Sequence, residues 1–142
     1  MSECFLYLIA SSIPLPANVS ADATICKIGI SADPTGRLAS LRTASPFSLE
    51  INAEWYFPNR EMAMFMERAA HKALDRYRVR GEWFAVDLSL ASYVITDCWC
   101  IESVERGILT PAKLVDDLIS RGYGADYATD AVISNYGEDS LQ

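Results

Sequence analysis

The sequence predicts an α+β fold in which a small three-stranded antiparallel sheet is flanked by helices and followed by an α-helical C-terminal extension. Two observations support this prediction. Patterns typical of strands and helices follow one another in the order β-β-α-β-α, and the rest of the chain shows only helical patterns. With 142 residues, the chain can form one domain and an appendage. We expect the domain to span residues 1–88 and the acidic extension to span residues 89–142.

Three segments have the composition or periodicity of strands. Residues 4–10 form a short apolar run, and residues 24–31 are rich in β-branched side chains. Residues 47–57 carry an apolar side chain at every second position, which predicts a strand with one buried face. The first two strands are separated by residues 11–23, whose serine, proline and asparagine content predicts a loop.

Helix-start signals place the helices. A capping residue followed by proline opens one at Asp33-Pro34, and we expect it to run to about Thr43. The longest helix begins after Asn59, a favourable N-cap, and its apolar residues recur at helical spacing to about Arg80. A strand is the alternative for part of the next helical segment, around residues 93–96. The remaining expected helices span residues 88–105, 111–122 and 126–136.

The composition of the chain indicates where in the cell we expect the protein and which kinds of metal site it lacks the ligands for. No apolar run approaches the roughly 20 residues that a membrane-spanning helix needs. The chain begins Met1-Ser2-Glu3, without the basic segment of a secretory signal, so we expect a cytoplasmic protein with no membrane partner. The four cysteines form no Cys-x-x-Cys pair and His71 is the single histidine, which argues against a structural zinc site.

Charge is unevenly distributed along the chain. The net charge is −7, but residues 27–84 carry nine Lys and Arg against seven Asp and Glu. Residues 85–142 carry three against ten. An acidic protein is a poor candidate for binding nucleic acid, yet this distribution leaves the basic middle segment open to polyanions.

A series of motifs lies in register with the β-β-α-β-α order and resembles the GIY-YIG nuclease superfamily. It most resembles the compact phage and bacterial branch, whose second motif reads Lys-Ile-Gly. The resemblance covers residues 4–88. Its motifs are Tyr7 in Phe-Leu-Tyr-Leu-Ile, Lys27-Ile28-Gly29-Ile30-Ser31, Asp33-Pro34 with Arg37-Leu38, Leu41 with Thr43 and Ser45-Pro46, Glu67 with His71, and Gly81-Glu82-Trp83-Phe84.

The resemblance implies phosphodiester hydrolysis with one divalent ion, Mg²⁺ or Mn²⁺, in a bacterial or phage-infected cell. Such chemistry needs a carboxylate to hold the metal, a base for the attacking water and a cation for the developing charge. Glu67 matches the metal-holding glutamate of the family, Arg37 its phosphate-facing arginine, and Tyr7 the tyrosine of the first motif.

The general base stays open between three residues. Where the best-known branch has a second tyrosine, this chain has Lys27, which could be a base only if its pKa fell well below about 10.4. Otherwise Lys27 is a phosphate clamp, and Tyr7 or His71 serves as base. Glu67 and His71 are four residues apart, so they share one helix face and the imidazole could also orient the carboxylate.

The expected partner is nucleic acid, with DNA preferred over RNA. Backbone contacts are expected from basic residues of the middle segment. A protein partner could bind residues 107–142, and a homodimer could form if the strand that contains Trp55 lies at an edge of the sheet. The nucleic-acid-binding residues that we predict are Arg42, Arg68, Lys72, Arg76 and Arg78.

A second interpretation assigns the same fold but no phosphodiester hydrolysis. The absent second tyrosine, the acidic balance and the small size would also suit a catalytically inactive binding module of GIY-YIG fold. Such a module would bind nucleic acid or a host protein, as a regulatory or anti-defence factor acting partly through the acidic tail.

Overall fold

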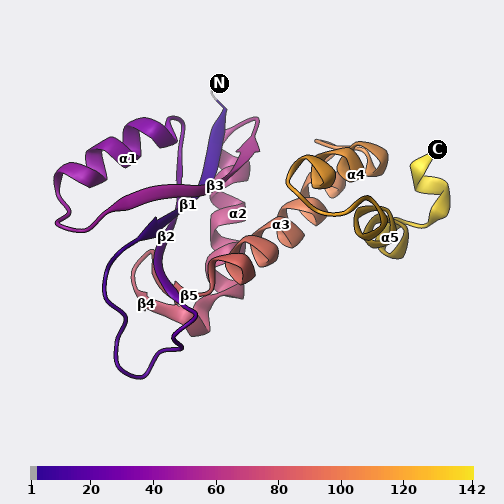
Figure 1. Ribbon diagram of the computed structural model, residues 1–142. Helices are drawn as coiled ribbons and strands as arrows, with labels where there is room; N and C mark the ends of the chain where they lie inside the picture. The colour runs from indigo at the N-terminus through magenta and orange to yellow at the C-terminus, as the bar shows by residue number, and fades with distance from the viewer. Residues whose placement is uncertain (1–2) are drawn as a thin grey trace. The chain divides into compact units, whose positions relative to one another are not determined.

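The computed structural model describes residues 3–142 and has an α+β fold (Figure 1). Within these residues, one antiparallel sheet has the strand order β3-β1-β2-β5-β4. The strands are β1 (Cys4–Ser11), β2 (Thr24–Ser31), β3 (Leu49–Phe57), β4 (Arg78–Arg80) and β5 (Trp83–Val86). The helices are α1 (Pro34–Thr43), α2 (Arg60–Ala73), α3 (Leu88–Glu105), α4 (Pro111–Ser120) and α5 (Ala125–Tyr136), with 3₁₀ turns η1 (Asp75–Tyr77) and η2 (Glu138–Leu141).

The chain divides into two compact units, Met1–Trp99 and Cys100–Gln142. The first unit contains the sheet, α1 and α2, and the second contains α4 and α5. The division falls inside α3 rather than at its start. The domain boundary that we expect after residue 88 stays a prediction.

The α+β class is confirmed, but the prediction of three strands is wrong. Residues 78–86 add a hairpin, β4 and β5, that pairs with the outer side of β2 through Phe84 and Cys26. Two features make this hairpin difficult to predict from the sequence. Its strands are only three and four residues long, and its first strand follows directly on a helical pattern.

The predicted extension of the second helix to about Arg80 is also wrong, because α2 ends at Ala73. Leu74 leaves helical geometry, and the Tyr77 amide then donates to the Leu74 carbonyl across 2.9 Å in a 3₁₀ turn. The apolar spacing continues through this turn because Leu74 is buried and Tyr77 is half-buried. Helical periodicity therefore persists in the sequence after the helix has ended. The other predicted helices are confirmed within two residues, and the strand alternative at residues 93–96 is wrong.

The two faces of the sheet are covered by different helices (Figure 1). Tyr7 and Ile9 of β1 pack with Leu38 of α1, so α1 covers their face. On the opposite face, the ring of His71 in α2 lies 5.2 Å from that of Phe84. The edge of β2 lies between these layers, because β2 has the hairpin as its outer neighbour along only part of its length.

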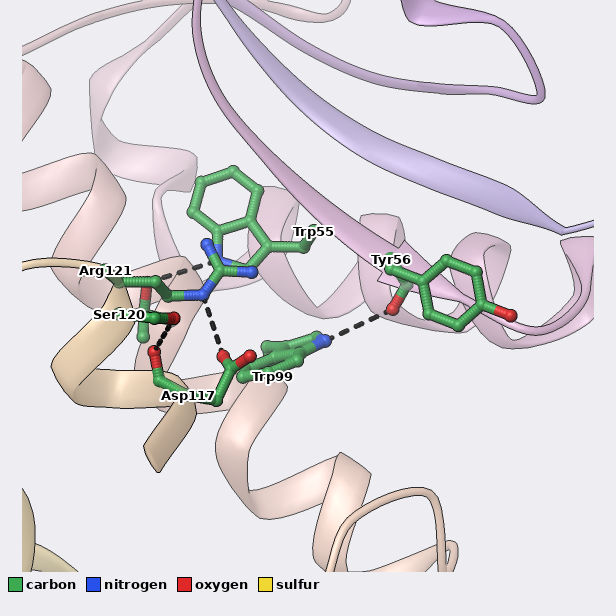
Figure 2. A network of polar contacts seen from close by, with 7 residues as sticks. Trp55, Tyr56, Trp99, Asp117, Ser120 and Arg121 are labelled. Atoms are coloured by element: carbon green, nitrogen blue, oxygen red, sulfur yellow. Dashed lines mark hydrogen bonds and ion pairs between the residues drawn. The ribbon is translucent and has the colours of Figure 1, made fainter. Parts of the chain in front are cut away.

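The first part of α3 is joined to β3 by tryptophan side chains. The indole nitrogen of buried Trp55 donates to Thr96 Oγ1 across 3.1 Å. Figure 2 shows the indole nitrogen of Trp99 directed at the backbone oxygen of Tyr56, at 3.3 Å. β3 is an edge strand, as the dimer hypothesis requires, and the dimer itself stays a prediction.

The second unit has a small core of its own. α4 and α5 contact each other and bury aliphatic side chains that include Leu114 and Val132. Near the end of α4, Arg121 forms an ion pair with Asp117, and the Ser120 hydroxyl donates to the Asp117 carbonyl (Figure 2). Among the helices of residues 3–142, none is long and apolar enough to cross a bilayer.

The hairpin turn provides a test of the fold. Gly81 has a φ of +58°, and a β-carbon added there would meet nothing within 4 Å, so Gly81→Ala isolates the backbone preference. We expect this substitution to lower the free energy of unfolding by about 1–2 kcal/mol, and Gly81→Asn to lower it less, because asparagine tolerates left-handed backbone. Urea unfolding of the three proteins measures both changes. An alanine variant as stable as the native protein would contradict the turn.

Candidate functional site

The candidate site lies where the outer edge of β2 loses its strand partner. β5 pairs with Thr24–Lys27, and Ile28 is the first residue of β2 beyond this pairing. The Ile28 amide donates to the carbonyl of Glu82, in the hairpin turn, across 3.0 Å. The Ile28 carbonyl lies 2.8 Å from Nε2 of His71, so an imidazole occupies the place where a strand amide would donate. Both α2 and the hairpin turn are therefore held to one residue of β2.

The contact with Ile28 assigns the ring nitrogens of His71. A backbone carbonyl only accepts hydrogen bonds, so Nε2 must carry a proton and donate it. In the neutral ring the lone pair is then on Nδ1. The bond between His71 and Ile28 also ties the last turn of α2 to the edge of β2.

Gly29 makes room for two functional groups. A β-carbon at this position would lie 2.5 Å from the hydroxyl oxygen of Tyr7 and 3.0 Å from Oε1 of Glu82. Tyr7 is the cross-strand partner of Gly29 and is only 1% exposed. Any side chain at position 29 would displace one of these groups. A phenol from β1 and a carboxylate from the hairpin turn therefore converge over the glycine.

Lys27 brings a buried cation to the same place. It lies two residues before Gly29 in β2, on the same face of the sheet, and is 8% exposed. Its ammonium forms an ion pair with Glu82, with 2.7 Å between Nζ and Oε1, and lies 5.6 Å from the ring centroid of Trp83. Sequence reasoning missed a role for Glu82. The Gly81-Glu82-Trp83-Phe84 motif was the available signal.

Arg37 reaches the hydroxyl of Tyr7 from α1. The helix start is ordered by Asp33, whose side chain accepts from the Gly36 amide across 3.1 Å, so Arg37 lies in the first turn. Burial raises the pKa of Tyr7 above its ordinary value of 10.0, and a hydrogen bond with the exposed Arg37 side chain opposes that rise. The phenol is thus protonated near neutral pH.

Glu67 completes the site from α2, one helical turn before His71. Burial raises the pKa of this carboxyl, and the negative charge of Glu82 raises it further. The positive charge of Lys27 acts in the opposite direction, as does His71 when its ring is protonated. These interactions place Glu67 within electrostatic reach of the groups gathered over Gly29.

The carboxylates suit Mg²⁺ or Mn²⁺ better than zinc. Within residues 3–142, no group of three or more His, Cys, Asp or Glu side chains is arranged to hold a metal ion. Mg²⁺ is commonly held by one or two carboxylates, together with water and substrate phosphate. A divalent cation at Glu67 would offset both its burial and its repulsion by Glu82. The residues present therefore fit the ion that the resemblance implies.

The predicted nucleic-acid-binding residues do not form one helix face. Arg68 and Lys72 are exposed on α2, but Arg76 lies in η1 and Arg78 in β4. Arg42, at the end of α1, is exposed, and its Nε donates to the Leu49 carbonyl across 3.0 Å.

Arg78 has partners in the hairpin and in the 3₁₀ turn that precedes it. Its guanidinium forms an ion pair with Asp75, donates to the Gly81 carbonyl and lies 4.9 Å from the ring centroid of Phe84. Together with Arg76 it also lines a cavity of about 490 Å³ that the loop between β1 and β2 helps to form. Nucleic-acid contact by these arginines stays a prediction.

Comparison with known proteins identifies one family. The sequence profile of the T5orf172 domain matches residues 5–100, which is nearly the extent of the first compact unit. Neither a curated protein nor a solved structure matches the chain significantly.

The raised pKa of Glu67 predicts how stability depends on pH. Because the folded protein favours the protonated carboxyl, ionisation of Glu67 destabilises the fold as the pH rises from the ordinary value of 4.5 through the raised pKa. In metal-free buffer, Glu67→Gln should therefore be more stable than the native protein at pH 7 to 8, and equally stable below about pH 4.

Urea unfolding across this pH range, with EDTA present, measures the difference. Glu61→Gln, which alters an exposed carboxylate of the same helix, should show no such gain. A Glu67→Gln protein that is less stable than the native one at pH 8 would contradict the electrostatic account of this residue.

Proposed function

We propose that this chain, which belongs to the T5orf172 domain family, is a divalent-metal-dependent endonuclease of GIY-YIG type that hydrolyses nucleic-acid phosphodiester bonds. The family is related to nuclease-type domains of the GIY-YIG and HNH kind. One observation carries the proposal further. Side chains from β1, β2 and α1 gather beside Gly29, at the open edge of β2, and the Glu67 carboxylate of α2 lies within electrostatic reach of them. Together they supply the groups that phosphodiester hydrolysis needs.

Glu67 would hold Mg²⁺ or Mn²⁺. When bound, the metal polarises the scissile phosphate and stabilises the leaving oxygen. Its position would depend on α2, which His71 ties to the Ile28 carbonyl. The chain's contribution here is to present one carboxylate of restricted exposure at a defined place on the edge of the sheet.

Arg37 and Lys27 would stabilise the negative charge that develops on the phosphate. The two cations approach from different elements, Arg37 from α1 and Lys27 from β2. Between them, the protonated hydroxyl of Tyr7 can donate a hydrogen bond to a phosphate oxygen or to the attacking water. Donors fixed before the reaction need little reorganisation when the charge appears, which is how such groups lower a barrier.

Among the three candidates for the general base, the contacts favour His71. The raised pKa of Tyr7 disfavours the phenolate, and the ammonium of Lys27, as part of an ion pair, has no lone pair to accept a proton. His71 donates through Nε2 and keeps a lone pair on Nδ1 when neutral. We assign proton acceptance to His71 Nδ1 and hydrogen-bond donation to Tyr7.

Arg68 and Lys72 would extend the site along α2. Both are exposed, and each directly follows a residue of the site, Arg68 after Glu67 and Lys72 after His71. Lysine and arginine side chains at such positions contact the nucleic-acid backbone without reading its sequence. We propose DNA as the preferred substrate, and a protein partner for the acidic residues 107–142.

The proposal predicts metal-dependent cleavage that requires two specific side chains. Supercoiled plasmid, linear duplex, single-stranded DNA and RNA are incubated with Mg²⁺ or Mn²⁺. Glu67→Gln should lower the cleavage rate by about 10³-fold or more through loss of the metal, and Arg37→Ala by about 10²–10³-fold. Glu61→Gln serves as the matched control, because it removes an exposed carboxylate from the same helix without touching the site.

Two outcomes would count against the proposal. Undiminished cleavage by Glu67→Gln would remove Glu67 from the mechanism. The absence of cleavage by folded native protein, together with retained binding of nucleic acid, would instead favour the inactive binding module.

A further inference from the structure

The pairing of Lys27 with Glu82 brings together one fixed partner and one accessible partner. The side chain of Lys27 is 9% exposed, whereas that of Glu82 is 41% exposed. Lys27 starts from a central strand and runs beside Trp83, so its ammonium has little freedom to move. Glu82 lies in a two-residue turn next to Gly81, and its side chain faces water on one side. Of the two side chains, Glu82 is therefore the one that can move out of the ion pair.

Because Lys27 is buried, its ammonium needs a negative group beside it both with and without substrate. An ammonium removed from water is costly unless a negative group compensates it. In the protein without substrate, Glu82 Oε1 supplies that charge at 2.7 Å. A phosphodiester also carries one negative charge and oxygen acceptors, so it can replace the carboxylate beside the ammonium. The released carboxylate would then be hydrated at little cost, because Glu82 is already half exposed.

We propose that Glu82 is a placeholder for the substrate phosphate, one that holds Lys27 until a phosphodiester displaces it. The inference rests on the proposed function, since it requires that the groups over Gly29 bind nucleic acid. Glu82 is a positioning residue in this account, because it acts through Lys27. It also weakens binding to nucleic acid that is poorly placed, since Lys27 is available only to a phosphate that reaches the site and displaces the carboxylate.

The test measures binding of a short DNA duplex to the full chain in EDTA, where no metal-dependent cleavage interferes. Glu82→Gln keeps the shape of the side chain and removes its charge, which frees Lys27 for a phosphate. We expect about fivefold tighter binding at low salt, the effect of one added charge contact near a protein surface. We also expect a slope of log K against log salt that is steeper by about 0.9, the value for one additional neutralised phosphate.

A double-mutant cycle separates the placeholder from a general charge effect. Lys27→Met keeps the packing of the stem and removes the ammonium. With methionine at position 27, Glu82→Gln should leave the salt slope unchanged and tighten binding no more than Glu61→Gln does. An equal gain at Glu82 in both backgrounds would overturn the inference, because the carboxylate would then act only through its charge.

The experiment also distinguishes this inference from the proposed function. If the native protein binds DNA but the effects of Lys27→Met and Glu82→Gln are additive, the placeholder is contradicted and the proposed function is not. If neither the native protein nor Glu82→Gln binds DNA or RNA, the proposed function fails, and the placeholder fails with it. Cooperative behaviour in the cycle supports the placeholder whether or not cleavage is later observed, because no step of the measurement depends on metal.

Discussion

The geometry of the site depends on how the backbone of Ile28 is satisfied. Buried amides and carbonyls need partners, and the β5 strand that pairs with the preceding residues of β2 stops one residue too early to supply both. The Glu82 carbonyl accepts from the amide, and His71 donates to the carbonyl. These two bonds attach the hairpin turn and α2 to the same point of the sheet. As a consequence, Glu82 lies beside Gly29 and Glu67 lies within electrostatic reach of Glu82.

The groups gathered there are unfavourable for folding and favourable for binding an ionic substrate. Lys27 is a buried cation, and Glu67 is a partly buried carboxylate that a second carboxylate repels. Structures retain such groups where function needs them, and perturbed pKa values therefore gather at functional sites. The metal would relieve the repulsion between carboxylates, and the phosphate would satisfy the cations. The site is thus complementary in charge to a metal–phosphate pair.

Elements with a strong local signal could be predicted from the sequence, and elements that depend on tertiary pairing could not. The Asp33-Pro34 start and the β-branched composition of β2 depend on neighbouring residues alone, and the structure confirms both elements. The hairpin of β4 and β5 needs β2 as a partner, because strands of three and four residues are not stable by themselves. For the same reason, Glu67 could be selected by its position in a motif, whereas the pairing of Glu82 with Lys27, 55 residues away, required the structure.

We propose that a metal and a phosphate bind together at the edge of β2. The most direct measurement is an anomalous difference map, at the manganese edge, from crystals of the full chain grown with Mn²⁺ and thymidine 3′,5′-bisphosphate. We expect a manganese peak at the Glu67 carboxylate, with a phosphate within reach of Arg37 and Tyr7. A bound nucleotide elsewhere, with no manganese at Glu67, would contradict it.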